Sequence, residues 1–125
     1  MKTRLAILLW AATPERHELC ATPFVLATAA AALDCEVEIH FAGRATRLLV
    51  NGVAERLYPA GEKTKSLYVF MKEAANLGVR FLGCGMALKG QTAPDEEFIA
   101  EYTGSATVTD FVLRALDPEW ATLVF

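Results

Sequence analysis

The sequence has few cysteines, no long apolar run and no basic cluster, and each of these absences excludes a class of protein. Its three cysteines are an odd number at irregular spacing, without a CxxC pair or a His/Cys ligand pattern, which argues against a disulfide framework and a zinc site. No apolar run approaches the roughly 20 residues of a membrane span. The net charge of −3, with twelve scattered Lys and Arg residues, argues against nucleic-acid binding.

Several common enzyme signatures are missing as well. Residues 9–12 (LWAA), at the end of the first apolar run, lack the glycines of a dinucleotide fingerprint, and there is no Walker loop. Gly83-Cys84-Gly85 lacks the one-residue spacing of a nucleophile elbow. A Cys–His pair stays open, because the sequence does not fix His17 or His40 beside a cysteine.

The length of 125 residues is typical of one domain, so we expect a single domain over residues 1–125. The hydrophobic content of 54% indicates a sheet covered on both faces or a surface buried between subunits. Lys2-Thr3-Arg4 before an apolar run imitates a signal peptide, but we interpret it as the basic start of a buried strand. Reduced thiols then favour a cytoplasmic protein.

Strand-like and helix-like segments alternate along the chain. We predict strands at residues 5–10, 35–41, 79–82 and 120–125, and helices at 23–33, 42–51, 66–77, 94–102 and 109–116. Thr22-Pro23 is typical of an N-cap followed by proline at the first helical position. Strand 35–41 alternates polar and apolar residues, so we expect it near a sheet edge or a polar interface. The pattern predicts an α/β fold with one mainly parallel sheet of about five strands and helices on both faces.

The clearest functional signal is the glycine-flanked Cys84. Residues 79–82 (VRFL) read as a buried strand, and a helix-like segment follows from Met86, so Cys84 falls at the carboxyl end of a strand, where open α/β sheets place their sites. We expect Gly83 and Gly85 to let the chain turn sharply and leave the sulfur uncovered. The backbone N–H groups of a helix starting at Met86 favour a thiolate. The alternative is that Cys84 is a small buried hydrophobe.

The remaining candidates sort by sheet edge, because parallel strands share one carboxyl edge. His17 and Cys20 lie in the loop after the first strand and His40 ends the second, so all three fall on the edge of Cys84. Cys20 is therefore a candidate second thiol. Cys35 opens the second strand on the opposite edge, and we interpret it as packing.

The order of the motifs is itself informative. A first strand with a Pro-containing loop is followed by a small-residue helix, then by strand 35–41, the Gly78-Val79 approach to the cysteine, the segment 84–90 (CGMALKG) and a terminal strand at 121–125. In this order the chain resembles the DsrE/DsrF-like family of small sulfur-relay proteins. It has Lys89-Gly90 where the family often has an arginine beside the glycine.

The resemblance implies a Rossmann-like three-layer sandwich that assembles into homotrimers or homohexamers. It further implies that Cys84 carries sulfane sulfur as a persulfide, taken from a donor protein and passed to an acceptor protein, in sulfur oxidation or tRNA thiolation. Such chemistry requires no metal and no organic cofactor. Whether the protein turns over as a sulfurtransferase or only carries sulfur stays open. Two alternatives remain: a thiol redox protein using Cys84 with Cys20, and a non-catalytic small-ligand or assembly module on the same fold.

Overall fold

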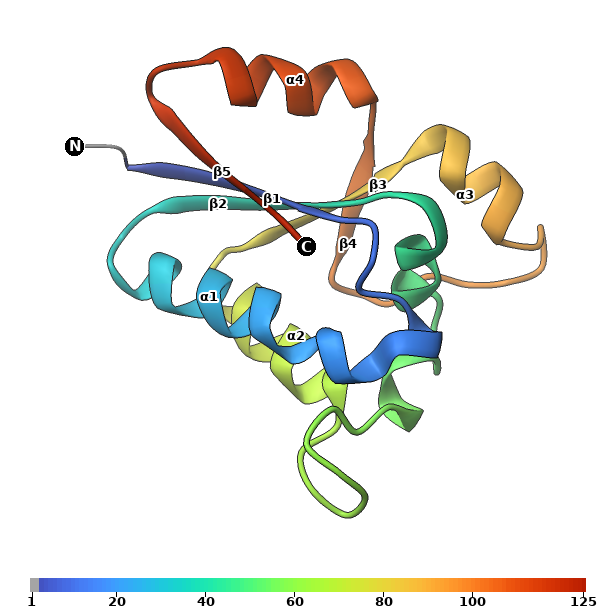
Figure 1. The fold of residues 1–125 in the computed structure, drawn as a ribbon. Helices are drawn as coiled ribbons and strands as arrows, with labels where there is room; N and C mark the ends of the chain where they lie inside the picture. Colours follow the sequence, from blue (N-terminus) through green and yellow to red (C-terminus); the bar gives the residue numbers. More distant parts are fainter. Residues whose placement is uncertain (1–2) are drawn as a thin grey trace.

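The computed structural model describes residues 3–125, in which five parallel strands form one sheet of order β4-β3-β2-β1-β5 (Figure 1). The strands are β1 (Arg4–Leu9), β2 (Glu36–Phe41), β3 (Arg80–Cys84), β4 (Tyr102–Ala106) and β5 (Trp120–Val124). The predicted α/β fold with a mainly parallel sheet is therefore confirmed.

Helices lie on both faces of the sheet. The α-helices are α1 (Ala21–Ala32), α2 (Leu67–Asn76), α3 (Gly85–Gln91) and α4 (Val108–Leu116), and the 3-10 helices are η1 (Pro14–Leu19), η2 (Gly43–Leu49) and η3 (Ala54–Arg56). In Figure 1, α1 and α2 cover one face, α4 covers the other, and α3 extends beyond the end of β3. No helix in the described part of the chain combines the length and apolarity needed to cross a bilayer.

The main core lies between the sheet and helices α1 and α2. Phe24 of α1 packs against Phe41 of β2 and Phe81 of β3, with ring centroids 5.5 to 6.1 Å apart, and all three side chains are fully buried. Each buried aromatic side chain contributes roughly 1.5–3 kcal/mol to folding. This face therefore anchors β2 and β3, the two strands that lead to the carboxyl edge of interest.

Strand β2 is central, so the prediction that residues 35–41 lie toward a sheet edge is wrong. It pairs with β1 on one side and β3 on the other. The polar residues that suggested an exposed face, Glu38 and His40, are 1% and 5% exposed. Arginines from β3 and α4 pair with Glu38, so the polar alternation marks a buried charged cluster and not contact with water.

Three local predictions are also corrected. Residues 94–102 form no helix, and the strand β4 that follows them was missed, because its polar sequence YTGSA has little apolar signal at a half-exposed edge. Helix α1 begins at Ala21 with Cys20 as its N-cap, so Thr22 is not the cap. Segment 42–51 folds as the 3-10 helix η2. The helices predicted at 66–77 and 109–116 are confirmed as α2 and α4.

The chain leaves β3 and β4 toward opposite faces of the sheet. After β3 it passes through α3 and returns on the α1/α2 face, where Ile99 joins the core and Phe98 bridges to Val50. After β4 it enters α4 on the other face (Figure 1). Adjacent parallel strands whose connections diverge in this way leave a crevice at their carboxyl ends. Cys84 and Ala106, which are paired across β3 and β4, lie at this crevice.

Candidate functional site

Cys84 is both the last residue of β3 and the N-cap of α3. Its backbone is extended, with φ −64° and ψ 117°, and its side chain makes no capping hydrogen bond. The residue is half-buried, neither sealed in the core nor free on the surface. The prediction that a helix follows this cysteine directly is confirmed.

The two glycines beside Cys84 have different surroundings. Neither has a positive φ, so the sharp turn expected from the sequence does not itself require glycine at either position. A Cβ atom on Gly83 would lie 2.9 Å from Leu88 Cδ1 and 3.2 Å from Leu49 Cδ1, so this glycine allows α3 to pack closely on the strand. A Cβ atom on Gly85 would meet nothing within 4 Å, so Gly85 adjoins open space.

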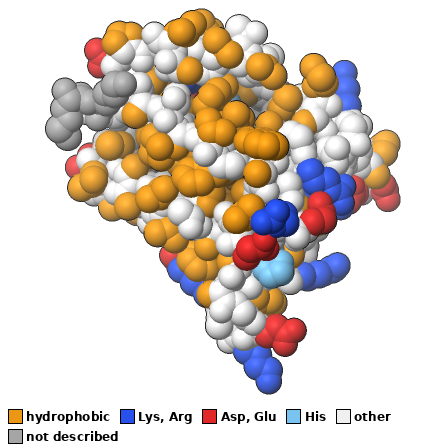
Figure 2. Space-filling model, in the orientation of Figure 1, with side chains coloured by type: hydrophobic (Ala, Val, Ile, Leu, Met, Phe, Trp, Pro, Cys, Tyr) orange, Lys and Arg blue, Asp and Glu red, His pale blue; other side chains and the backbone are white. Residues whose placement is uncertain are grey.

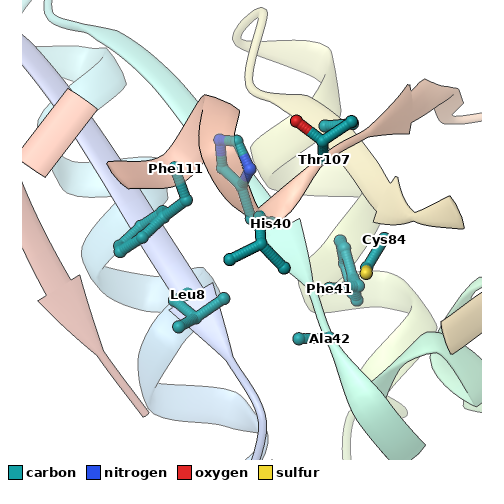
Figure 3. A pocket seen from close by; sticks show the side chains of 9 residues that line it. Leu8, His40, Phe41, Ala42, Cys84, Thr107 and Phe111 are labelled. Carbon is teal, nitrogen blue, oxygen red and sulfur yellow. The ribbon is translucent and has the colours of Figure 1, made fainter. Parts of the chain in front are cut away.

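Two cavities adjoin Cys84. The first, here called the small cavity, has a volume of about 120 Å³ and an almost wholly apolar lining between the sheet and α4 (Figure 3); its walls include Leu8, His40, Ala42, Ala106, Val108 and Phe111. The second, here called the large cavity, has a volume of about 390 Å³ and a more polar lining that includes Met86, Ser105, Thr109 and Asp110. Cys84 and Thr107 line both cavities.

A buried ionic cluster holds His40 beside the small cavity. Glu38 accepts hydrogen bonds from Arg114 Nε at 3.1 Å and from Arg80, and its Oε1 lies 3.1 Å from His40 Nε2. Burial alone raises the pKa of Glu38, but hydrogen bonds from Arg114 and His40 and the charges of Arg114 and Arg80 outweigh it and bring the pKa below its usual value. Glu38 is therefore ionised at neutral pH.

The start of α4 is fixed over the site by a capping box. Thr107 Oγ1 accepts a hydrogen bond from the backbone N–H of Asp110 at 3.1 Å, and Asp110 Oδ2 accepts one from the backbone N–H of Thr107 at 2.7 Å. One turn on, the ring of Phe111 meets His40 edge to face, with centroids 5.4 Å apart. The cap thus sets the position of the helix that forms the roof of the small cavity.

Cys20 and His17, which were predicted on the same sheet edge as Cys84, line neither of the two cavities beside it. Cys20 is fully buried at the start of α1, its Sγ 3.4 Å from the carbonyl oxygen of Thr13, and burial raises the pKa of its thiol to about 12. His17 is exposed and lines neither cavity. Of the sequence candidates, only His40 shares a cavity with Cys84. The burial of Cys20 argues against its role as a second thiol, which requires a reactive thiolate.

Sequence reasoning missed the contribution of α4 and β4. Arg114 holds Glu38, while Phe111 and Thr107 line the small cavity, and all three follow a strand that has no clear signal in the sequence. The signals that were available are local: the Thr107-x-x-Asp110 spacing of a capping box, and the arginine one turn after Asp110. Among residues 3–125, no group of three or more His, Cys, Asp or Glu side chains is placed to bind a metal ion.

The fold and site define a small α/β domain with a half-buried cysteine at the divergence point of a parallel sheet. This chain belongs to the DsrE/DsrF-like family, whose sequence profile matches residues 6–117. No curated protein sequence matches the chain.

Solved structures share the fold over the whole chain. One is the YchN protein of E. coli, with a TM-score of 0.75 and 14% identity over 100% of both chains. Another is MTH1491 of Methanobacterium thermoautotrophicum, described as a protein of unknown function, with a TM-score of 0.66 and 15% identity over 99% of this chain and 100% of the other. At these identities the likeness shows the fold alone.

Proposed function

We propose that this protein is a sulfur carrier that holds sulfane sulfur as a persulfide on Cys84 and passes it to a partner protein. Membership of the DsrE/DsrF-like family supports a sulfur-relay role. The observation that carries the assignment to Cys84 is its position on the wall shared by an apolar and a more polar cavity, at the divergence of β3 and β4. A sulfur atom there can be reached from outside and still be partly shielded from water.

The chemistry consists of two displacements at sulfur. The Cys84 thiolate attacks the outer sulfur of a donor persulfide R–S–SH, a new S–S bond forms as the S–S bond of the donor breaks, and R–S⁻ leaves. The thiolate of an acceptor then attacks the outer sulfur of Cys84–S–SH, which releases the Cys84 thiolate and yields the acceptor persulfide. Each step conserves the oxidation level of the transferred sulfur, so neither a metal nor an organic cofactor takes part. The second step regenerates the carrier.

Donor and acceptor proteins approach through the large cavity. Met86, on its rim, is 79% exposed, and Val108, on the wall between the two cavities, is 64% exposed. Exposed, flexible methionine beside other apolar side chains is typical of surfaces that contact more than one protein. We place this relay in the cytoplasm, where thiols stay reduced.

A homotrimer or homohexamer is part of the proposal. Exposed apolar side chains gather on α4 and β5: Val112, Leu113, Leu116, Leu123 and Val124. Figure 2 shows hydrophobic side chains spread across the face where β5 and α4 lie in Figure 1. Strand β5 also pairs only with β1 and so leaves one edge of the sheet open. Light scattering after gel filtration tests this assembly, and a monomer at micromolar concentration contradicts it.

Mass spectrometry under non-reducing conditions tests the carrier function. After incubation with glutathione persulfide, Cys84 should gain roughly 32 Da, the mass of one sulfur atom, as a reversible modification of the thiol. Cys84→Ser should gain nothing, and buried Cys20 in the same molecule serves as an internal control. An unmodified Cys84 in the folded wild-type protein contradicts the proposal.

A further inference from the structure

His40 has one ring nitrogen held by a charged partner, and this leaves the other for a second partner. The residue is 5% exposed, and its Nε2 lies 3.1 Å from Oε1 of the ionised Glu38. A carboxylate can only accept hydrogen bonds, so Nε2 is the donor to Glu38. Nδ1 is then left to form a hydrogen bond with another group.

The Nδ1 atom has no protein partner. No hydrogen bond among residues 3–125 involves Nδ1. Every fully buried side-chain nitrogen or oxygen of these residues has a hydrogen-bond partner, so Nδ1 is not one of the fully buried atoms. His40 lines the small cavity, and its ring is held against Phe111 at a centroid distance of 5.4 Å. A nearly buried polar atom thus belongs to a cavity whose lining is otherwise almost wholly apolar, which is an arrangement that suits a small ligand with one polar atom.

Cys84 and His40 approach this cavity from the same face of the sheet. His40 is paired with Leu82 on the neighbouring strand, and Cys84 follows two residues later, so alternation directs both side chains toward α4 at positions roughly 7 Å apart along the strands. Figure 3 shows the imidazole and the sulfur on these two strands at the cavity. A persulfide extends the side chain of Cys84 by one S–S bond of about 2 Å.

We propose that the small cavity houses the outer sulfur of the Cys84 persulfide and that His40 Nδ1 is the hydrogen-bond partner of that sulfur. This inference rests on the proposed function and specifies its substrate. The volume of about 120 Å³ holds a terminal sulfur but lies below the roughly 300 Å³ at which pockets begin to hold larger ligands. The transferable group is therefore a single terminal sulfur, and the rest of the donor occupies the large cavity. A glutathione mixed disulfide has no terminal sulfur and is too large for the small cavity.

Two substitutions of His40 separate its contact with Glu38 from its contact with the cavity. In His40→Gln, the amide nitrogen can replace Nε2 as a donor to Glu38, but no polar atom remains at the position of Nδ1. In His40→Asn, the side-chain amide is close to the position of Nδ1 and restores a hydrogen-bonding group toward the cavity. Both variants retain Arg80 and Arg114 as partners of Glu38.

The readout is the rate at which cyanide removes the outer sulfur as thiocyanate after loading with glutathione persulfide. Loss of one hydrogen bond should make this removal about five- to tenfold faster in His40→Gln, and His40→Asn should stay within about twofold of wild type. Equal rates in wild type and folded His40→Gln overturn the inference. An equal acceleration in both variants overturns it as well, because Asn restores a hydrogen-bonding group at the position of Nδ1.

A second measurement uses the wild-type protein and does not depend on the folding of a variant. The ¹⁵N resonance of His40 Nδ1 should shift when Cys84 is loaded with sulfur, but not when Cys84 carries glutathione and not in Cys84→Ser treated in the same way. Sulfur loading without a shift of Nδ1 overturns this inference and leaves the carrier function intact. Absence of any mass gain on Cys84 overturns the carrier function, and the inference falls with it.

Discussion

Adding one methyl group on each side of Cys84 should change the stability of the protein in opposite directions. At Gly83, the new Cβ would lie 2.9 Å from Leu88 Cδ1 and 3.2 Å from Leu49 Cδ1. Leu49 is fully buried and Leu88 half-buried, so the Leu88 side chain or helix α3 must shift to accept the new atom. Overpacking of this kind costs about 1–3 kcal/mol. The lower chain entropy of Ala than of Gly offsets roughly 0.5–1 kcal/mol of this cost.

Gly83→Ala should therefore lower the free energy of unfolding by up to about 2.5 kcal/mol and the Tm by up to about 10 °C. Gly85→Ala is the matched control, because its Cβ meets nothing within 4 Å and its φ is not positive. This variant should be more stable than wild type by roughly 0.5–1 kcal/mol. Thermal and urea denaturation measure both values. If Gly83→Ala is as stable as Gly85→Ala, close packing of α3 on β3 is not what requires Gly83.

Three further predictions concern the surroundings of the site. Cys84 should react with iodoacetamide in the native protein, while Cys20 should react only after unfolding. The pKa of about 12 leaves roughly one part in ten thousand of the Cys20 thiol as thiolate at pH 8. Equal labelling rates of the two cysteines in the native protein contradict this prediction. Glu38→Gln should lower the free energy of unfolding by about 2–4 kcal/mol at pH 7. Because the folded-state pKa of Glu38 is lowered from 4.5, this difference in the free energy of unfolding should be fully present above pH 4.5 and decline as the pH falls through the folded-state pKa. A difference that does not change with pH argues against an ionised Glu38. Thr107→Ala should cost about 1 kcal/mol and accelerate hydrogen exchange in α4 but not in α1, whereas an equal change in both helices argues against a local role of the cap.

The sequence predicts best the parts of this fold whose apolar pattern is strong. The sheet with helices on both faces and the helix after Cys84 follow from buried strands and from glycine placement, and both are present. Strand β4 was missed because its five residues include glycine, serine and threonine at a half-exposed sheet edge, so neither alternation nor an apolar run marks it. Without β4, the crevice between the carboxyl ends of β3 and β4 beside Cys84 could not be recognised from the sequence.

The role of Glu38 and His40 could not be predicted for a different reason. Polar residues that alternate along a strand predict a wet face only when nothing charged covers them. Here Arg114 reaches Glu38 from a helix 76 residues further along the chain, and a partner at such a separation cannot be identified from local pattern. His40 therefore looked like a surface residue, although it is almost completely buried at the cavity.

One face of the sheet contains the main core, and the other face contains the small cavity of the candidate site. The α1/α2 face holds the fully buried phenylalanines, whereas α4 on the other face has no fully buried residue and is held by its capping box, by the contact of Arg114 with Glu38 and by Phe111 on His40. An element with so little buried apolar surface opens at a lower free energy than the core. Since α4 forms the roof of the small cavity, a local opening of this helix would expose the cavity with little disturbance of the core. The ionic cluster opposes such an opening, because Arg114 of α4 pairs with the buried Glu38.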